Sequence, residues 1–150
     1  LCGMHAMDIM RMESGFLHWG HDISPEENQY EAGLNFAISH KKNIDFIGKK
    51  SLIKIKKKKQ FTMLTLKKSK PGEPLMLHDE PIYFNGKIIG RTTSGNYSFN
   101  FDKNLAFGYL KTDEDINSLK NGLIEIEIEK NKYEAEILTR PLNQKNFKNS

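Results

Sequence analysis

The second half of the chain alternates apolar and polar residues with a period of two. Isoleucines alternate with glutamates over 123–129, and Tyr133, Ala135 and Ile137 share one face after a turn at 130–132. Such alternation is typical of strands that have one face on a core and the other in solvent. Further strands are predicted at 61–66, 82–84, 87–95 and 105–110. About six short strands without helical spacers predict a small antiparallel barrel or sandwich.

The most specific local pattern in this region is a hairpin. Asn85 and Gly86 lie between two apolar runs, and this residue pair suits the two positive φ values of a type I′ turn. The second strand continues into the polar segment 91–95, which contains hydroxyls, a cation and a glycine. We interpret this segment as a β-bulge with satisfied polar side chains, and a loop at the edge of a ligand site is the alternative.

The first third of the chain has a mixed pattern. Good helix formers over 4–14 end at Gly15 and predict a helix with a left-handed stop. The elements expected next are an aromatic and histidine-rich loop at 16–22 and either a turn or a short capped helical start at 24–27. A strand at 34–39 and a basic amphipathic helix at 49–55 follow.

The predicted fold class is therefore α+β. Residues 1–56 form an α+β unit, residues 60–142 form a small antiparallel β-barrel packed against it, and residues 143–150 form a polar tail that we expect to be the carboxyl end.

Composition and charge narrow the function classes. The 150 residues carry a formal net charge of +4, with the excess concentrated in lysines between 54 and 59. Because no aromatic residues interleave with this run, we expect no nucleic-acid partner. No apolar run approaches the roughly 20 residues of a membrane-spanning helix, so we expect no membrane span. A lone cysteine, Cys2, favours a reducing cytoplasm.

The chain begins with Leu1-Cys2-Gly3 rather than with an initiator methionine. It also lacks the charged leader and cleavage site of a signal peptide. We therefore expect a piece of a longer protein, with part of its chemistry upstream.

Candidate metal ligands occur in one place. His5, His18, His21 and Asp22 lie near one another in the sequence, but no set of them has convincing ligand spacing. Hydrogen-bonded loop histidines are the better interpretation, and we predict no metal site. The sequence also lacks G-x-S-x-G, H-E-x-x-H, P-loop and G-x-G-x-x-G motifs, which removes support for serine, cysteine or zinc hydrolysis.

Two kinds of side chain around the first helix are candidates for binding. Arg11 and Glu13 are two apart, so they point in different directions and each needs another partner. Arg11 is either a surface charge or an anchor for carboxylates and loop carbonyls. Phe16 and Trp19 follow the helix. The sequence alone favours core packing for both rings, and a flat-ring clamp on a ligand is the alternative.

The same residues carry a resemblance to a known family. The segments that resemble the glycine-cleavage T-protein family, in the same order and spacing, are 7–16 (MDIMRMESGF), 18–25 (HWGHDISP), 31–34 (EAGL), 45–49 (DFIGK), 90–95 (GRTTSG) and 105–109 (LAFGY). They extend over nearly the whole chain. The Trp-Gly-His-Asp sequence is most similar to the folate-binding half of dimethylglycine and sarcosine dehydrogenases.

The resemblance implies a tetrahydrofolate site. The family's ring-contacting aromatic falls on Phe16 and its Tyr-Gly position on Trp19-Gly20; with them we assign Arg11 and Met7 to folate binding. T-proteins have an arginine at the position of Met7, so one polar folate contact is missing. The implied reaction transfers a one-carbon unit from a methylated amine, or a glycine-derived aminomethyl group, to tetrahydrofolate and gives 5,10-methylenetetrahydrofolate.

The resemblance also implies that the rest of the protein is needed. The family's catalytic Asp and most of the pterin pocket lie upstream, so residues 1–56 correspond to the end of the folate-binding domain and we expect the 150-residue chain alone to be inactive. In a dehydrogenase, FAD belongs to the upstream part. The alternatives are a free-standing aminomethyltransferase, a demethylase of a sulfonium substrate, and a non-catalytic folate-binding relative, which typically carries a cysteine-centred motif that we do not find.

Overall fold

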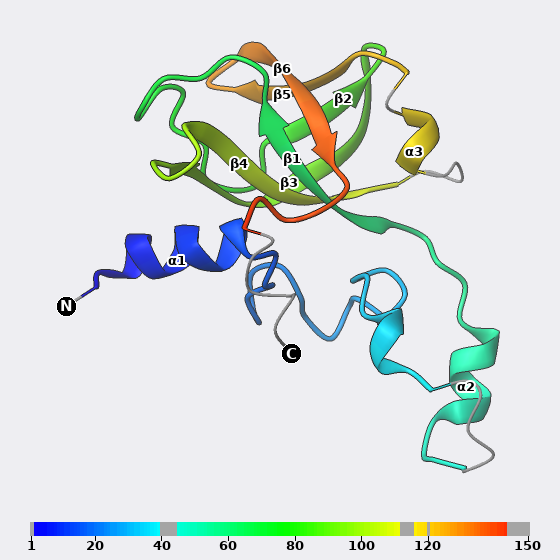
Figure 1. The fold of residues 1–150 in the computed structure, drawn as a ribbon. Coiled ribbons are helices and arrows are strands. Elements are labelled where there is room, and N and C mark those ends of the chain that lie inside the picture. The colour runs from blue at the N-terminus through cyan, green and yellow to red at the C-terminus, as the bar shows by residue number, and fades with distance from the viewer. Residues whose placement is uncertain (1, 40–44, 112–115, 120, 144–150) are drawn as a thin grey trace.

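The main body of the chain is a closed barrel. The computed structural model describes residues 2–39, 45–111, 116–119 and 121–143. Six antiparallel strands close the barrel in the order β1-β4-β3-β2-β5-β6 (Figure 1). Their bounds are β1 Gln60–Leu66, β2 Pro81–Phe84, β3 Lys87–Ser98, β4 Lys103–Leu110, β5 Ile124–Ile128 and β6 Asn131–Leu138. The predicted barrel is confirmed, and the sandwich alternative is wrong because β6 pairs back onto β1.

The barrel interior is filled by the apolar residues of the alternating strands. In β5 the three isoleucines are buried and the two glutamates between them are partly exposed. Leu64, Ile82 and Leu110 contribute from other strands to the same cluster. Burial of such side chains contributes about 1.5–3 kcal/mol each, so this interior is the main source of the barrel's stability.

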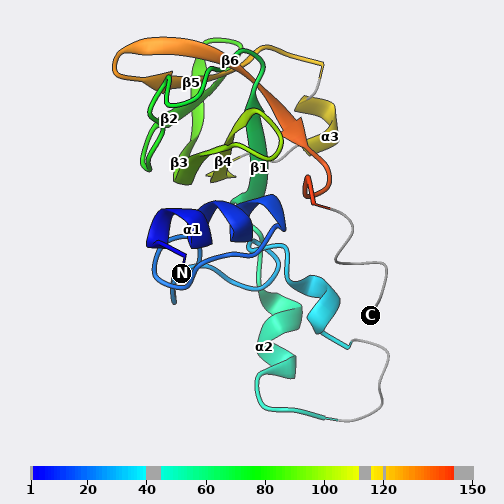
Figure 2. The ribbon, with the colours of Figure 1, turned by 60° about the vertical axis from the view of Figure 1, so that its left-hand side comes forward.

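Strand β4 differs from the other strands because both of its faces are buried. Ala106 and Leu110 belong to the barrel interior, whereas Leu105 and Phe107 belong to a second cluster with Met12 of helix α1 (Met4–Glu13). Figure 2 shows α1 lying across the outside of the barrel. The helix therefore covers an apolar patch on the outer wall.

Each of the two tight β-hairpins, β2–β3 and β5–β6, has two consecutive turn residues with positive φ. Asn85 and Gly86 have φ values of 48° and 81°, which confirms the predicted type I′ geometry. The β5–β6 turn uses Glu129 and Lys130, with φ values of 51° and 66°. That turn begins one residue earlier than predicted. Glutamate and lysine rarely adopt positive φ, so the sequence carries no signal for a turn at these two positions.

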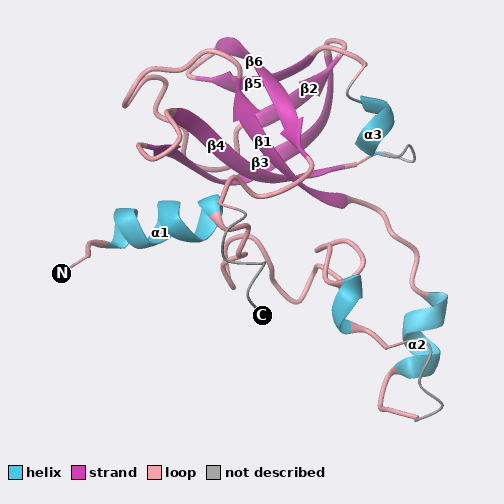
Figure 3. Ribbon diagram, viewed as in Figure 1, coloured by secondary structure: helices cyan, strands magenta, loops and turns pink. Residues whose placement is uncertain are grey.

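The observed helices (Figure 3) match the predicted elements only in part. Helix α1 ends one residue before the predicted boundary, and α2 (Lys49–Lys54) lies within the predicted amphipathic helix but has no buried residue. The predicted strand at 34–39 is wrong. A 3-10 turn, η1 (Asn35–Ala37), lies there, and Phe36 is 84% exposed, so no neighbouring strand covers this segment.

Among the described residues, none of the helices is both long and apolar enough to cross a bilayer.

Loop segments before and after the barrel are attached by specific hydrogen bonds. The Glu31 carboxylate accepts the backbone N–H of Lys58 at 2.9 Å, and the Glu31 carbonyl accepts the N–H of Phe61 at 2.8 Å. At the other end, the N–H of Asn143 donates to the carbonyl of Glu13 at 2.9 Å. The rest of the predicted polar tail, 144–150, lies outside the described residues.

A third helix, α3 (Ile116–Leu119), follows β4, and the sequence analysis does not predict it. Ile116 and Leu119 are buried, and Leu119 belongs to the barrel cluster. Four residues are too few to show a helical period, so the sequence pattern carries no signal for it.

Candidate functional site

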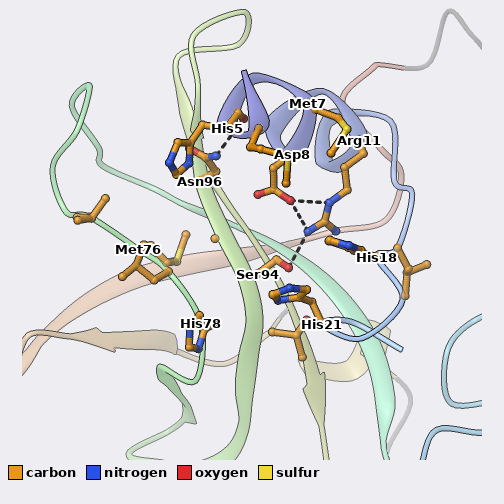
Figure 4. Close-up of a pocket in the computed structure, with 16 residues that line it drawn as sticks. His5, Met7, Asp8, Arg11, His18, His21, Met76, His78, Ser94 and Asn96 are labelled. Carbon is orange, nitrogen blue, oxygen red and sulfur yellow. Dashed lines mark hydrogen bonds and ion pairs between the residues drawn. The ribbon is translucent and has the colours of Figure 1, made fainter. Parts of the chain in front are cut away.

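A groove of about 480 Å³ lies where helix α1 meets the barrel. One wall is the exposed face of α1, with Met4 and Met7, and the opposite wall is the segment 75–78 that precedes β2. The residues of β3 from 93 to 96 form the floor (Figure 4). A groove of this size and apolar character is in the range of small-molecule sites.

Arg11 is the charged residue at the centre of this region. Its side chain is only 14% exposed and forms ion pairs with Asp8 and Asp22. The guanidinium donates to the Ser94 hydroxyl at 2.8 Å and to the Phe16 carbonyl at 3.2 Å. The interpretation of Arg11 as an anchor for carboxylates and a loop carbonyl is therefore the correct one, and a simple surface charge is not.

Asp22 is the main partner of Arg11, and its side chain is fully buried. Its carboxylate accepts hydrogen bonds from the hydroxyls of Thr93 at 2.5 Å and Ser94 at 2.8 Å, and from the N–H of His18 at 2.9 Å. With all these donors in place, the buried charge is compensated on both oxygens.

The carbonyl of Asp22 is also bonded, to the Tyr109 hydroxyl at 2.9 Å. Burial, reinforced by the nearby carboxylates of Glu27, Asp22 and Glu31, raises the pKa of Tyr109. Tyr109 therefore keeps its proton and remains a donor to the loop over the physiological pH range.

Strand β3 supplies its hydroxyls through an irregularity. The register with β4 shifts between Thr92 and Ser94, so Thr93 and Ser94 both reach Asp22. The predicted bulge with satisfied polar side chains is confirmed. Thr93 and Ser94 also line the groove, so the bulge and the edge of a candidate ligand site are the same segment.

The four proposed folate-binding residues fall into two groups. Met7 and Arg11 line the groove. Phe16 and Trp19 are not among the lining residues and are 56% and 68% exposed, so the expectation of core packing is wrong for this chain. Both rings lie on the loop that Asp22 and Arg11 fasten to the barrel.

The histidines of the candidate metal cluster also meet at the groove. His5, His18 and His21 line it, together with His78 from the segment 75–78, and the rings of His18 and His21 are 4.6 Å apart. Asp22 is committed to Arg11 and the β3 hydroxyls. Across the residues that the structure describes, no group of three or more candidate ligands is arranged to hold a metal ion.

Two parts of this site could not be predicted from the sequence. The sequence offers Asp22 only as a candidate metal ligand, because its partners Thr93 and Ser94 lie more than 70 positions away and no local signal points to them. The segment 75–78 gave no signal, because its place depends on packing against Gly95. A Cβ at Gly95 would lie 2.5 Å from Met76 Cγ, so only glycine permits this approach.

Comparison with known proteins identifies the family. Residues 59–143 match the glycine cleavage T-protein C-terminal barrel domain, and residues 1–42 match the GCVT N-terminal domain. The chain belongs to the glycine cleavage T-protein family. Its similarity to a 4-methylaminobutanoate oxidase (formaldehyde-forming) of Paenarthrobacter nicotinovorans is 36% identity over 94% of this chain and 17% of the relative.

Further relatives in the T-protein family include dehydrogenases and transferases. The mitochondrial dimethylglycine dehydrogenase of Homo sapiens is 36% identical over 93% of this chain and 16% of its own length. An aminomethyltransferase of Symbiobacterium thermophilum is 36% identical over 73% of this chain and 29% of its own length. The chain thus spans about a sixth of the first two relatives.

A solved T-protein structure has the same fold. The glycine cleavage system aminomethyltransferase T from Bartonella henselae superposes with a TM-score of 0.74 at 24% identity, covering 91% of this chain and 38% of that chain. The fold of this chain is therefore shared with that structure over nearly all of its length.

Proposed function

We propose that this chain is the carboxyl-terminal part of a tetrahydrofolate-dependent one-carbon enzyme that acts on a methylated amine. Residues 1–56 would complete its folate-binding domain, and residues 60–142 would be its terminal barrel. Similarity over 93–94% of the chain to enzymes named for methylated amines favours such a substrate over a sulfonium compound. We propose a cytoplasmic location from the cysteine content, although several relatives are named as mitochondrial.

The observation that carries this proposal is the exposure of two fixed aromatic rings beside the groove. Phe16 and Trp19 are large apolar side chains that are more than half exposed, and polar contacts of Asp22 and Arg11 hold their loop in this position. Exposed apolar surface with such an anchor is typical of a binding surface. The rings suit the flat pterin and aminobenzoyl groups of a folate.

The groove residues would contribute the remaining contacts. Met7 offers a soft apolar surface, and Arg11 holds the loop and the floor together. Tetrahydrofolate, when bound, supplies the two nitrogens that accept the one-carbon unit. The acid–base residue for this step is expected upstream, together with FAD if the whole protein is a dehydrogenase.

Steady-state kinetics of the complete protein would test the proposal. We expect Phe16→Ala and Trp19→Ala to raise the KM for tetrahydrofolate about tenfold or more, because each loses a large stacking surface. Phe99→Ala is the matched control, since Phe99 is a similarly exposed ring that lies in the β3–β4 turn and not on the loop 16–22. Unchanged KM values in both loop variants, or an equal rise in the control, would exclude the folate role.

A second candidate is a free-standing aminomethyltransferase, supported by the relative from Symbiobacterium thermophilum. The sequence upstream of this chain distinguishes the two. A dinucleotide-binding fingerprint ahead of the folate domain is expected only for a flavin-dependent dehydrogenase.

A further inference from the structure

We infer that Asp22 is a positioning residue that fixes the aromatic loop, residues 16–22, on the barrel wall and so sets where Phe16 and Trp19 point. Asp22 does not line the groove, and its side chain is inaccessible to solvent, so it acts through the loop. Its consequence for ligand binding rests on the proposed folate function. Its effect on the loop can be tested independently of any ligand.

The carboxylate of Asp22 first closes the loop on itself. One oxygen accepts the backbone N–H of His18 at 2.9 Å, and the N–H of Asp22 donates to the His18 carbonyl at 2.8 Å. The N–H of Gly20 donates to the Ile23 carbonyl at 2.8 Å. Hydrogen bonds between residues before and after Gly20 thus close the turn that carries Trp19. Gly20 itself has a φ of 92°, which favours glycine.

The same residue then attaches the closed turn to three other elements. Its other oxygen accepts both β3 hydroxyls, from Thr93 and Ser94, and its carbonyl accepts the Tyr109 hydroxyl of β4. The ion pair with Arg11 connects it to α1. A buried carboxylate that accepts hydrogen bonds from donors on several fixed elements has only one favourable position. The loop that carries this carboxylate is therefore held in one position relative to those elements.

The exposed rings depend on this attachment more than a buried ring would. More than half of each side chain, of Phe16 and of Trp19, faces solvent, so core packing restrains them only in part. Arg11 also donates to the Phe16 carbonyl, which ties the start of the loop to the same ion pair. Loss of Asp22 would therefore loosen both ends of the loop.

Glu13, on helix α1 just before the aromatic loop, provides a matched control for Asp22. It is equally buried, and its carboxylate accepts hydrogen bonds from Ser98 at 2.6 Å and from Asn100 at 3.0 and 3.2 Å. These partners belong to the end of β3 and the following turn. Glu13→Ala thus removes a buried carboxylate between helix and barrel without touching the contacts of the aromatic loop.

Trp19 is the single tryptophan of the 150-residue chain, so its time-resolved fluorescence anisotropy reports on the loop directly. We expect Asp22→Ala to raise the amplitude of the nanosecond component about twofold, and Glu13→Ala to leave it unchanged. Asp22→Asn should lie closer to the native chain, because its amide oxygen can face Arg11 and the His18 N–H while its NH2 donates to the hydroxyls.

Ser94→Ala gives a milder version of the same test if Asp22→Ala does not fold. It removes the hydroxyl that joins Arg11 to Asp22 but leaves the ion pair, so we expect a smaller change in the same direction. An unchanged anisotropy in folded Asp22 and Ser94 variants would overturn the inference. An equal increase in Glu13→Ala would also overturn it, because the loosening would then be general.

Kinetics of the complete protein give the second readout. We expect Asp22→Ala to raise the KM for tetrahydrofolate about tenfold with kcat changed less than about threefold, since misplacement weakens binding without removing a reacting group. If Phe16→Ala and Trp19→Ala raise KM and Asp22→Ala does not, the inference fails. If the ring variants have no effect, the folate proposal fails, while the anisotropy still decides the role of Asp22.

Discussion

At the scale of single residues, the first 34 residues are attached to the barrel mainly by carboxylates. Asp22 and Glu13 bond to β3 and the turn after it, and Glu31 bonds to the backbone before β1. Glu27 forms an ion pair with Lys59, whose ammonium also lies 5.0 Å from the centre of the Tyr109 ring. The polar contacts of these acids therefore define how the loops lie on the barrel.

Glu27 gives a pH-dependent prediction at this scale. Burial pushes the pKa of Glu27 upward, but the hydrogen bonds from Lys59 and Ser24 outweigh burial, and the pKa lies below its ordinary value of 4.5. The folded chain therefore holds this proton less readily than the unfolded chain. The stabilisation is complete above about pH 4.5 and is lost as the pH falls through the lowered pKa.

The variant Glu27→Gln should remove this dependence. We expect it to lower the free energy of unfolding by about 0.5–1 kcal/mol near neutral pH and to converge with the native chain in acid. Urea unfolding between about pH 3 and pH 7 measures the difference. A difference that stays constant over this range would show that the charge of Glu27 is not the cause.

At the scale of elements, the two hairpins form a natural comparison. Both turns place two consecutive residues at positive φ, but β2–β3 uses Asn85-Gly86 and β5–β6 uses Glu129-Lys130. A left-handed conformation costs an ordinary residue about 1–2 kcal/mol, and glycine avoids this cost. The β5–β6 hairpin is therefore strained at its turn, and the rest of the barrel compensates.

Replacing Glu129-Lys130 by Asn-Gly should stabilise the chain. We expect the double variant to raise the free energy of unfolding by about 1 kcal/mol, because it relieves two strained positions and the gain exceeds the added flexibility of glycine in the unfolded chain. Gly86→Ala is the reverse experiment and should destabilise by about 1 kcal/mol. Chemical denaturation measures both, and a destabilised Asn-Gly variant would contradict the explanation.

The sequence pattern predicted the strands of the barrel, whether one face or both faces are buried, but it did not predict the segment 34–39. β5 alternates because one face meets the barrel interior and the other meets solvent. β4 lacks alternation because α1 covers its outer face, and its apolar run was enough to predict it. The segment 34–39 looks like a strand, but a strand needs a partner, and pairing is decided by tertiary structure rather than by local pattern.

At the scale of the whole molecule, the candidate site is open on one side. The family resemblance assigned Met7, Arg11, Phe16 and Trp19 to one folate site. In the structure Met7 and Arg11 line the groove, whereas Phe16 and Trp19 lie outside it on an anchored loop. That separation follows from contacts between residues more than 70 positions apart, such as Asp22 with Thr93 and Ser94, which sequence spacing does not reveal. A ligand touching both groups would remain partly in solvent.

This openness predicts weak binding by the chain alone. We expect the 150 residues to bind tetrahydrofolate with a Kd weaker than micromolar, because a half-open site leaves much of the pterin in water. We also expect no turnover of dimethylglycine. Isothermal titration calorimetry measures the affinity, and a micromolar Kd would contradict the prediction that the remainder of the protein completes the site.

Because both faces of β4 are buried, the barrel is difficult to prepare without the residues that precede it. A chain truncated just before Gln60 would lose helix α1. The outer wall would then expose one contiguous apolar patch made of Phe61, Met63, Leu105 and Phe107. Such a truncated barrel would aggregate unless these positions were redesigned with polar side chains.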